Sequence, residues 1–288
     1  MSDGKRVLVT GAAGGLGRHV VRHLHDLGHD VVALDVRPRD VELPVEVHEV
    51  DLAESDAAAA WMDGADGIVH LANHPNESVK LPRPLLAENL TMNVNVFQAA
   101  FEKSVPRVIF ASSVQVIASE VRVSRTDSGF AHAYLPLDSD TPANPLNHYG
   151  MSKRLSENML DMFVPLGLPS AVSFRFPWLC DPEQVQRAEQ DAATTVDHPG
   201  AESRVRQMFS LLPKPEAARL ISLALDADLI GHHIYFPTET RHYRRMPIPQ
   251  VIQRYYPDVA LKHPIDQIET LVDVSKITTE LGWSPSSD

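Results

Sequence analysis

The stretch that decides the fold is Val7-Leu-Val-Thr-Gly11-Ala-Ala-Gly14-Gly-Leu-Gly17-Arg-His-Val-Val21. Its first residues are β-branched and apolar, which predicts a buried strand. Apolar side chains then recur at Leu16, Val20 and Leu24, the spacing of one face of a helix. The glycines between the two patterns predict a tight turn that joins the strand to the helix.

Each of the three spaced glycines suits a different demand of such a turn. Gly11 allows the tight bend, Gly14 lets a pyrophosphate approach the backbone without a Cβ in the way, and Gly17 lets the helix pack closely on the strand. The helix N-terminus adds free N–H groups and a partial positive charge. The stretch is therefore a candidate phosphate cradle, although a glycine-rich turn without a ligand has the same pattern.

The composition is that of an ordinary globular chain. It has 288 residues, 43% hydrophobic and 22% charged, enough for one large domain or for one domain with a small appended lobe. The net charge of −12 argues against a nucleic-acid or anionic-membrane partner. No apolar run approaches the roughly 20 residues that span a bilayer, and we expect no signal peptide before the first strand. Because a single cysteine, Cys180, cannot form an internal disulfide, we expect a cytoplasmic protein.

An acidic residue ends the next apolar run. Asp35 lies 18 residues after Gly17, where a dinucleotide-binding fold places the carboxylate that accepts hydrogen bonds from the adenine ribose. A carboxylate at that point repels a 2′-phosphate, which favours NAD over NADP. Arg37 weakens this preference, since a nearby guanidinium can bind such a phosphate. Our prediction is NAD.

From there the chain alternates apolar runs with helical patterns. We expect further strands at 29–35, 45–50, 67–72, 105–113, 168–176 and 233–236, helices at 57–62, 85–103, 149–163 and 215–225, and a last short helix closed by Gly282. This rhythm predicts an α/β fold, a doubly wound parallel sheet with helices on both faces. The polar, proline-bearing stretch 119–147 is long for a connection, and such loops often build or cover a site.

A tyrosine and a lysine follow that loop on one predicted helix. Of six tyrosines, Tyr149 is the one with a lysine four residues later, Lys153, so the two side chains share a helix face. A nearby ammonium favours the phenolate and lowers the tyrosine pKa, as a general base near neutral pH requires. Ser113 ends a predicted strand, where ligands collect in an open α/β sheet, and its hydroxyl can hold a substrate oxygen. A Tyr-x-x-x-Lys pair by itself often occurs by chance on a helix surface. Here it follows the glycine turn and the strand-end serine along the same chain, which favours a catalytic role over a chance pair.

The combined motifs resemble the extended short-chain dehydrogenase/reductase family, in its NAD-dependent epimerase/dehydratase branch. The resemblance covers residues 5–176 and rests on Thr10-Gly-Ala-Ala-Gly-Gly-Leu-Gly17, Asp35, Asp51-Leu52, His70-Leu-Ala72, Asn89, Ser112-Ser113 and Tyr149-Gly-Met-Ser-Lys153. Further along, Val272 to Pro285 resembles the C-terminal motif of the same branch.

The resemblance implies a Rossmann-type sheet, NAD as cofactor and roles for particular residues. Tyr149 is implied as the catalytic acid/base, Lys153 as its pKa partner and ribose ligand, and Ser113 as the catalytic hydroxyl, with Ser112 as the competing assignment. The implied cofactor contacts are Gly11, Ala13, Gly14, Gly15, Leu16, Gly17, Asp35, Asp51, Leu52, Leu71, Ala72, Asn89, Tyr149 and Lys153. From the residues alone, Asp51 caps a turn as readily as it contacts adenine.

Departures from the branch concern the substrate. Val114 and Gln115 stand where sugar-nucleotide 4,6-dehydratases usually carry Asp-Glu, which disfavours dehydration by that pair. The usual asparagine after the sixth strand is missing from Arg175-Phe-Pro-Trp178. We therefore expect a small substrate such as a free sugar or sugar acid, as in uronate-type dehydrogenases, turned over by a dehydrogenase or an epimerase. The alternative is a non-enzymatic dinucleotide sensor of the same fold, which would not need Ser113, Tyr149 and Lys153.

Further substrate contacts are predicted among basic residues. Besides Ser113, we expect His148, Arg175 and Arg244 to contact the substrate, since arginines bind carboxylates and phosphates bidentately. His132 is a further candidate. For His132, His148 and Arg244, a solvated basic patch on an acidic protein is the alternative. The 14 histidines include no pattern with a matching carboxylate or cysteine framework, so we expect no metal.

The expected organisation is a large cofactor domain with a small C-terminal lobe. We place the NAD-binding domain at 1–176, rejoined by 215–236, and a substrate-binding lobe at 177–214 and 237–288. The family resemblance also suggests a homodimer formed through a helix pair that includes the Tyr149 helix.

Overall fold

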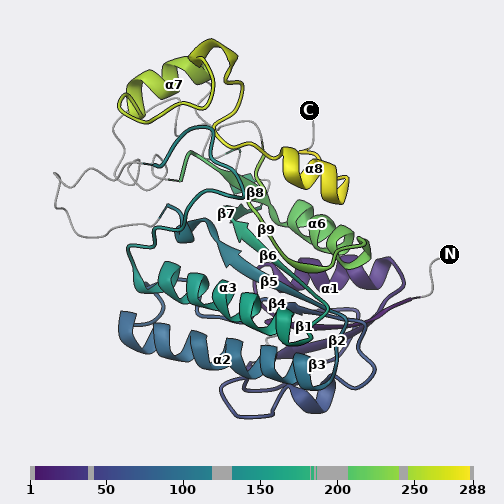
Figure 1. The fold of residues 1–288 in the computed structure, drawn as a ribbon. Helices are drawn as coiled ribbons and strands as arrows, with labels where there is room; N and C mark the ends of the chain where they lie inside the picture. The colour runs from purple at the N-terminus through teal and green to yellow at the C-terminus, as the bar shows by residue number, and fades with distance from the viewer. Residues whose placement is uncertain are drawn as a thin grey trace.

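The computed structural model describes residues 4–37, 42–118, 132–181, 183–184, 186, 207–239 and 246–285. Seven parallel strands form the central sheet in the order β3-β2-β1-β4-β5-β6-β9 (Figure 1). Their bounds are Arg6–Thr10 for β1, Asp30–Asp35 for β2, Val47–Glu49 for β3, Gly67–His70 for β4, Arg107–Ser113 for β5, Ser170–Phe176 for β6 and Gly231–Tyr235 for β9. The strand order reverses between β1 and β4, which is where ligands bind in open sheets of this kind.

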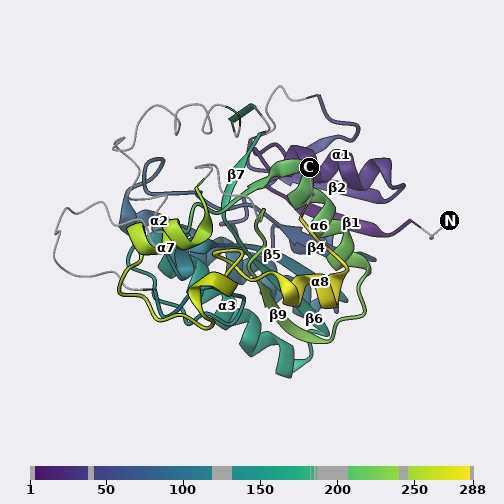
Figure 2. The ribbon, with the colours of Figure 1, turned by 90° about the horizontal axis from the view of Figure 1, so that it is seen from above.

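Helices cover both faces of this sheet. One face carries α1 (Gly17–Asp26), α6 (Lys214–Asp226) and α8 (Ser275–Leu281), and the other carries α2 (Pro82–Glu102) and α3 (His148–Leu166) (Figures 1 and 2). The predicted doubly wound α/β fold is therefore confirmed. The last helix ends before Gly282, as the sequence predicts.

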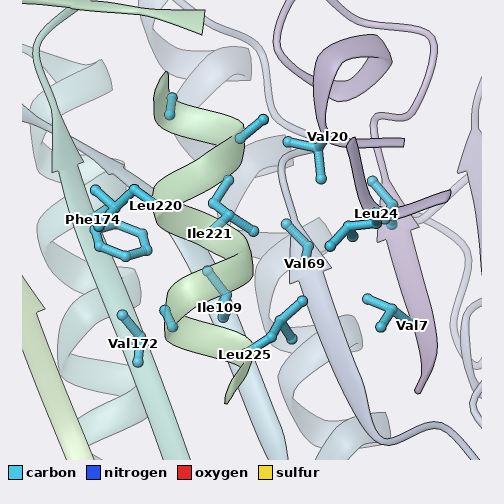
Figure 3. Close-up of a cluster of buried hydrophobic side chains, with 14 of the residues drawn as sticks. Val7, Val20, Leu24, Val69, Ile109, Val172, Phe174, Leu220, Ile221 and Leu225 are labelled. Carbon is cyan, nitrogen blue, oxygen red and sulfur yellow. The ribbon is translucent and has the colours of Figure 1, made fainter. Parts of the chain in front are cut away.

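Alternation along the strands sorts the apolar side chains into two core layers. In β1, Val7 and Val9 pack under α1 and α6, whereas Leu8 packs on the opposite side. All three side chains are fully buried, because a parallel sheet covered on both faces leaves no strand face to water. Figure 3 shows Leu220 and Ile221 of α6 lying over the sheet, in the core layer that contains Val7.

A third apolar cluster lies above the carboxyl edge of the sheet. It combines the 3₁₀ turn Val114–Val116 with a small two-stranded sheet, β7 (Trp178–Cys180) and β8 (Leu211–Pro213), and with α7 (Ile248–Tyr255). Figure 1 shows α7 above the strand ends. The cluster also takes Leu135 and Leu137 from within 1–176. The exact domain limits stay a prediction.

Several local expectations differ from the structure. The helix expected at 57–62 is a single 3₁₀ turn, Ala59–Trp61, and Asp56 just before it has a left-handed φ of 61° that limits any helix on its N-terminal side. Strand β4 ends at His70 and not at residue 72, since the next two N–H groups turn to the Thr10 hydroxyl. The short β7 and β8 and the helix α7 were not predicted.

No helix in the described part of the chain is both long enough and apolar enough to cross a membrane.

Candidate active site

The glycine turn between β1 and α1 is built by backbone contacts that exclude side chains. Gly11 has a φ of 68°, as the tight bend requires. A Cβ at Gly17 would lie 2.1 Å from the Gly11 carbonyl oxygen and 2.8 Å from Ala12. The helix therefore packs against the turn itself, more than against the strand that we expected. The Gly14 N–H donates to the Gly11 oxygen at 3.0 Å and closes the bend.

The turn leaves backbone donors available. Within the described residues, the N–H groups of Gly15, Leu16 and Gly17 donate to no protein acceptor. The Ala13 N–H, in contrast, is already bonded to a side chain. Three free donors at a helix N-terminus form a cradle suited to an anion such as a pyrophosphate.

Asp35 ends β2 beside this turn. Its Oδ2 accepts the Ala13 N–H at 3.0 Å and its Oδ1 accepts the Arg37 N–H at 3.1 Å. A carboxylate has about four acceptor positions, and the described residues use two of them, which leaves two for ribose hydroxyls. The Arg37 side chain is exposed. The predicted acidic position is thus next to the predicted phosphate cradle, and the residues fit a dinucleotide.

The other expected cofactor contacts lie along the same edge of the sheet. Asp51 is exposed and its Oδ1 accepts the Ala53 N–H at 2.9 Å, which is the turn cap that we considered as its alternative role. The Leu52 side chain is buried in the second core layer, so only its backbone can face a ligand. The N–H groups of Leu71 and Ala72 donate to the Thr10 hydroxyl, which holds this segment against the glycine turn.

Helix α3 brings Tyr149 to the end of β5. The Asn147 side chain caps the helix by accepting the Gly150 N–H at 2.7 Å. A Cβ at Gly150 would lie 2.3 Å from the Gln115 carbonyl oxygen, so the glycine lets the helix start against the 3₁₀ turn after β5. The Tyr149 and Ser113 hydroxyls are hydrogen-bonded to each other as a result.

The two serines at the end of β5 point to opposite sides. The Ser112 hydroxyl donates to Glu157 Oε1 at 2.7 Å in the interior. Ser113 faces Tyr149, and its oxygen also accepts the Gln115 N–H at 3.2 Å. Strand alternation therefore brings Ser113, and not Ser112, to the tyrosine.

Lys153 lies buried one turn further along α3. Its Nζ donates to Asn73 Oδ1 and to the Ala111 carbonyl oxygen, both at 2.7 Å, and lies 5.6 Å from the centre of the Tyr149 ring. Burial lowers the pKa of Lys153 to about 7, against the opposing effect of Glu157. These two acceptors are the ones that the described residues offer, so one of its three N–H donors is available to a ligand.

The lowered pKa expected for Tyr149 was wrong. Burial raises the pKa of Tyr149 to about 12, and the Ser113 hydroxyl opposes this only in part. Desolvation disfavours the phenolate, and the same burial weakens the charge of Lys153 that was expected to stabilise it.

A buried hydrogen-bond chain connects Lys153 to the strand before the glycine turn. From Asn73, which accepts from Lys153, it continues to Asn93 Oδ1 at 2.7 Å, then to His70 Nε2 at 2.8 Å, and from His70 Nδ1 to the Thr10 hydroxyl at 2.7 Å. Burial lowers the pKa of His70 to about 3, so the ring is neutral. The chain fixes the position of Lys153 without adding charge.

Asn89 holds the segment after β4. Its Oδ1 accepts the His74 N–H at 2.8 Å, and its Nδ2 donates to the His74 carbonyl oxygen and to Ser152 at 3.2 and 3.3 Å. This is a supporting position; a direct cofactor contact stays a prediction.

Arg175 is not placed to contact a substrate, which corrects our expectation. Its guanidinium is buried and donates to both carboxylate oxygens of Glu157 at 3.0 Å, and its third nitrogen donates to the carbonyl oxygens of Thr141 and Ser139 at 3.0 and 3.4 Å. The charge that seemed available for a substrate is used to join α3, β6 and the segment before α3.

The remaining basic candidates are dispersed. His148 is exposed, with its ring nitrogen 3.5 Å from Glu77. His132 is buried against Tyr256. Arg244 lies outside the described residues. No group of three metal-binding side chains occurs in the described part of the chain.

Asn73 and Glu157 were missed at the sequence level. Asn73 is the first polar residue after a predicted strand, and Glu157 follows Lys153 by one helical turn. Both positions can be found in the sequence by their spacing. Polar residues at strand ends and on helices are so frequent, however, that spacing alone does not mark these two as functional.

The comparisons with known proteins agree with this geometry. A model of the NAD dependent epimerase/dehydratase family matches residues 7–203. A uronate dehydrogenase of Pseudomonas syringae is 28% identical over 239 residues, which are 80% of this chain and 73% of that protein. A uronate dehydrogenase of Agrobacterium fabrum is 36% identical over 161 residues, or 55% of this chain and 56% of that protein. A UDP-glucose 4-epimerase of Lactobacillus helveticus is 28% identical over 54% of this chain and 46% of that protein. The chain thus spans about half the length of the last two.

Solved structures share the whole fold. The uronate dehydrogenase of Agrobacterium tumefaciens superposes with a TM-score of 0.66 at 25% identity, covering 98% of this chain and 85% of that one. A UDP-galactose 4-epimerase has a TM-score of 0.67 at 22% identity, covering 98% and 94%. At that identity the second likeness shows the fold alone.

Proposed function

Because the chain belongs to the NAD-dependent epimerase/dehydratase family, we propose that it is an NAD-dependent oxidoreductase acting on a hydroxyl of a sugar or sugar derivative. The family resemblance read from the motifs is thereby confirmed, and NAD is the cofactor of the family. The observation that carries the proposal is the meeting of Ser113, Tyr149 and Lys153 at the carboxyl edge of one sheet. A protein that only binds a dinucleotide has no need of this group.

We assign residues to three groups of the cofactor: the pyrophosphate and the two riboses. We assign the pyrophosphate to the N–H groups of Gly15, Leu16 and Gly17 and the adenine ribose to Asp35. The third N–H of Lys153 is assigned to the other ribose. When bound, NAD accepts the hydride that leaves the substrate carbon.

The side chains handle the proton of the same reaction. In the oxidative direction Tyr149 takes the proton of the substrate hydroxyl, while Ser113 donates a hydrogen bond to the substrate oxygen as it becomes a carbonyl. A pKa of about 12 makes Tyr149 a poor base near neutral pH unless its surroundings lower it. Keeping Lys153 protonated near Tyr149 lowers that pKa, because a cation stabilises the phenolate.

We favour a dehydrogenase that releases its product over an epimerase that returns the hydride. A uronate dehydrogenase is the relative that matches the larger share of the chain, 80%, whereas the epimerase match covers 54%. The missing asparagine after β6 also argues against a nucleoside diphosphate on the substrate. A uronic acid is accordingly the first substrate to test.

The test is NADH formation by the purified protein with uronic acids, free aldoses and UDP-glucose. We expect NADH with a uronic acid or a free aldose, and NADP to bind less tightly than NAD. Tyr149→Phe should leave less than a few per cent of the activity with nearly unchanged NAD affinity. Tyr134→Phe serves as the control, because Tyr134 donates to Asp138 away from the serine and lysine.

Each other outcome redirects the proposal. Conversion of UDP-glucose to its 4-epimer without net NADH would establish the epimerase. NAD binding without reduction by any substrate would establish the sensor. Tighter binding of NADP would refute the argument from Asp35.

We also propose a homodimer through α2 and α3. Met151, Met162 and Leu166 are 37, 50 and 61% exposed and lie on one face of α3. Sedimentation at micromolar concentration should give twice the monomer mass, and Met162→Glu should shift it toward the monomer. A cytoplasmic location, favoured by the single cysteine, is part of the same proposal.

A further inference from the structure

A lysine from the far part of the chain lies over the glycine turn. Lys214 begins α6, which packs beside α1 (Figure 3). Its Cε is 3.9 Å from the position that a Cβ of Gly15 would occupy, and its side chain is only 13% exposed. A long cationic side chain is therefore held next to Gly15, the first of the three residues whose N–H groups form the anion site.

The partner of this lysine is an aspartate from a third element. Lys214 Nζ donates to Asp181 Oδ2 at 2.6 Å, directly after β7, and the other oxygen of Asp181 is 3.6 Å from His19 Nε2 on α1. The neighbouring lysine lowers the pKa of Asp181, while burial lowers the pKa of His19. At neutral pH the site is thus an ammonium paired with one carboxylate.

We propose that Lys214 binds the pyrophosphate of the cofactor and exchanges Asp181 for it when the cofactor enters. This inference rests on the proposed NAD-binding function. An ammonium is a compact charge that suits phosphate oxygens. Three backbone donors compensate a pyrophosphate incompletely, because it carries two negative charges. Asp181 compensates Lys214 in the free protein and is released to solvent, to which it is already 31% exposed.

The alternative is that the Lys214–Asp181 ion pair only stabilises the packing of β7 on α6, and this alternative predicts different cofactor affinities for the two variants. If the pair is structural, removing either partner disturbs the turn equally and weakens cofactor binding to the same extent. If Lys214 exchanges partners, removing Asp181 takes away its competitor. The two variants then shift affinity in opposite directions.

The experiment is titration calorimetry of the full chain with NAD, ADP-ribose and adenosine. We expect Lys214→Gln to weaken NAD and ADP-ribose about tenfold or more and to leave adenosine, which has no phosphate, within twofold. Lys214→Arg should restore most of the loss, because it keeps the charge. Asp181→Asn should bind ADP-ribose more tightly than the wild type, because the competitor of the pyrophosphate for Lys214 is gone. Lys103→Gln and Asp63→Asn, an ion pair of 2.7 Å elsewhere, are the matched controls.

The outcomes separate this inference from the function on which it rests. If the wild type binds NAD and Lys214→Gln binds ADP-ribose within twofold of it, Lys214 is not a pyrophosphate ligand. Equal weakening by Lys214→Gln and Asp181→Asn overturns the exchange in favour of a structural pair. A wild type that binds neither NAD nor ADP-ribose refutes both this inference and the proposed function.

Discussion

Two buried cations at the carboxyl edge of the sheet have opposite surroundings. Arg175 and Lys153 are each 3% exposed. Arg175 is neutralised by both oxygens of Glu157. Among the described residues, Lys153 donates to the neutral oxygens of Asn73 and Ala111, and burial lowers its pKa to about 7. The difference indicates that the fold has already compensated Arg175, whereas Lys153 keeps a donor and a titratable charge for chemistry.

The strongest test of this contrast removes the uncompensated cation. Lys153→Met should lower kcat/KM about 10³-fold, because the reaction loses the group that favours the Tyr149 phenolate. The free energy of unfolding should not fall, since the variant no longer buries an unpaired ammonium. Steady-state kinetics and urea unfolding at pH 7 measure the two effects, with Lys103→Met as a surface control. A variant that keeps a tenth of the activity would show that Lys153 is structural.

Removing the charge of Glu157, the partner of Arg175, should lower the stability of the fold. Glu157→Gln leaves the Arg175 guanidinium buried without a counter-charge, which costs about 3–5 kcal/mol in the free energy of unfolding. Urea unfolding measures the loss. Glu88→Gln is the control, because Glu88 bonds His74 and Lys80 at the surface, and an exposed pair contributes about 0–1 kcal/mol. Similar losses in both variants would contradict the contrast.

A pH titration sharpens the contrast without altering Arg175. Unfolded Lys153 titrates near its usual 10.5, and the folded group near 7. Between these values the unfolded state binds the extra proton, so the free energy of unfolding should rise with pH through this window, by at most about 1.4 kcal/mol per unit. Below pH 7 both states are protonated and the full penalty is present. Lys153→Met should lack this rise; an identical pH dependence in both proteins would contradict the shifted pKa.

At the carboxyl edge of the sheet, the sequence predicted those features that depend on the periodicity of a single strand or helix. The glycine turn, Asp35 at the end of β2 and the Tyr149–Lys153 face of α3 depend on spacing within one or two elements. They lie where the pattern predicts. Local spacing determines local geometry, so these positions were readable without knowledge of the tertiary fold.

What the sequence could not predict depends on contacts between distant segments. Arg175 looked like a substrate ligand because nothing in its neighbourhood reveals that Glu157, 18 residues earlier, neutralises it. The raised pKa of Tyr149 likewise results from burial by several elements. The strands β7 and β8 were missed because they are three residues each, too short for a periodic signal.

The smallest expected effect concerns the two neighbouring serines. The Ser112 hydroxyl donates to Glu157, the carboxylate that neutralises Arg175, whereas Ser113 bonds Tyr149 in the candidate active site. Ser112→Ala should cost about 0.5–1.5 kcal/mol of unfolding free energy, because Glu157 keeps both bonds to Arg175, and should leave kcat within a few-fold. Ser113→Ala should do the reverse, with a larger loss in kcat than in stability. Kinetics and urea unfolding of both variants check this pair. If Ser112→Ala impaired kcat more than Ser113→Ala, the separation of structural from chemical groups along β5 would not hold, and Ser112 would become the catalytic hydroxyl.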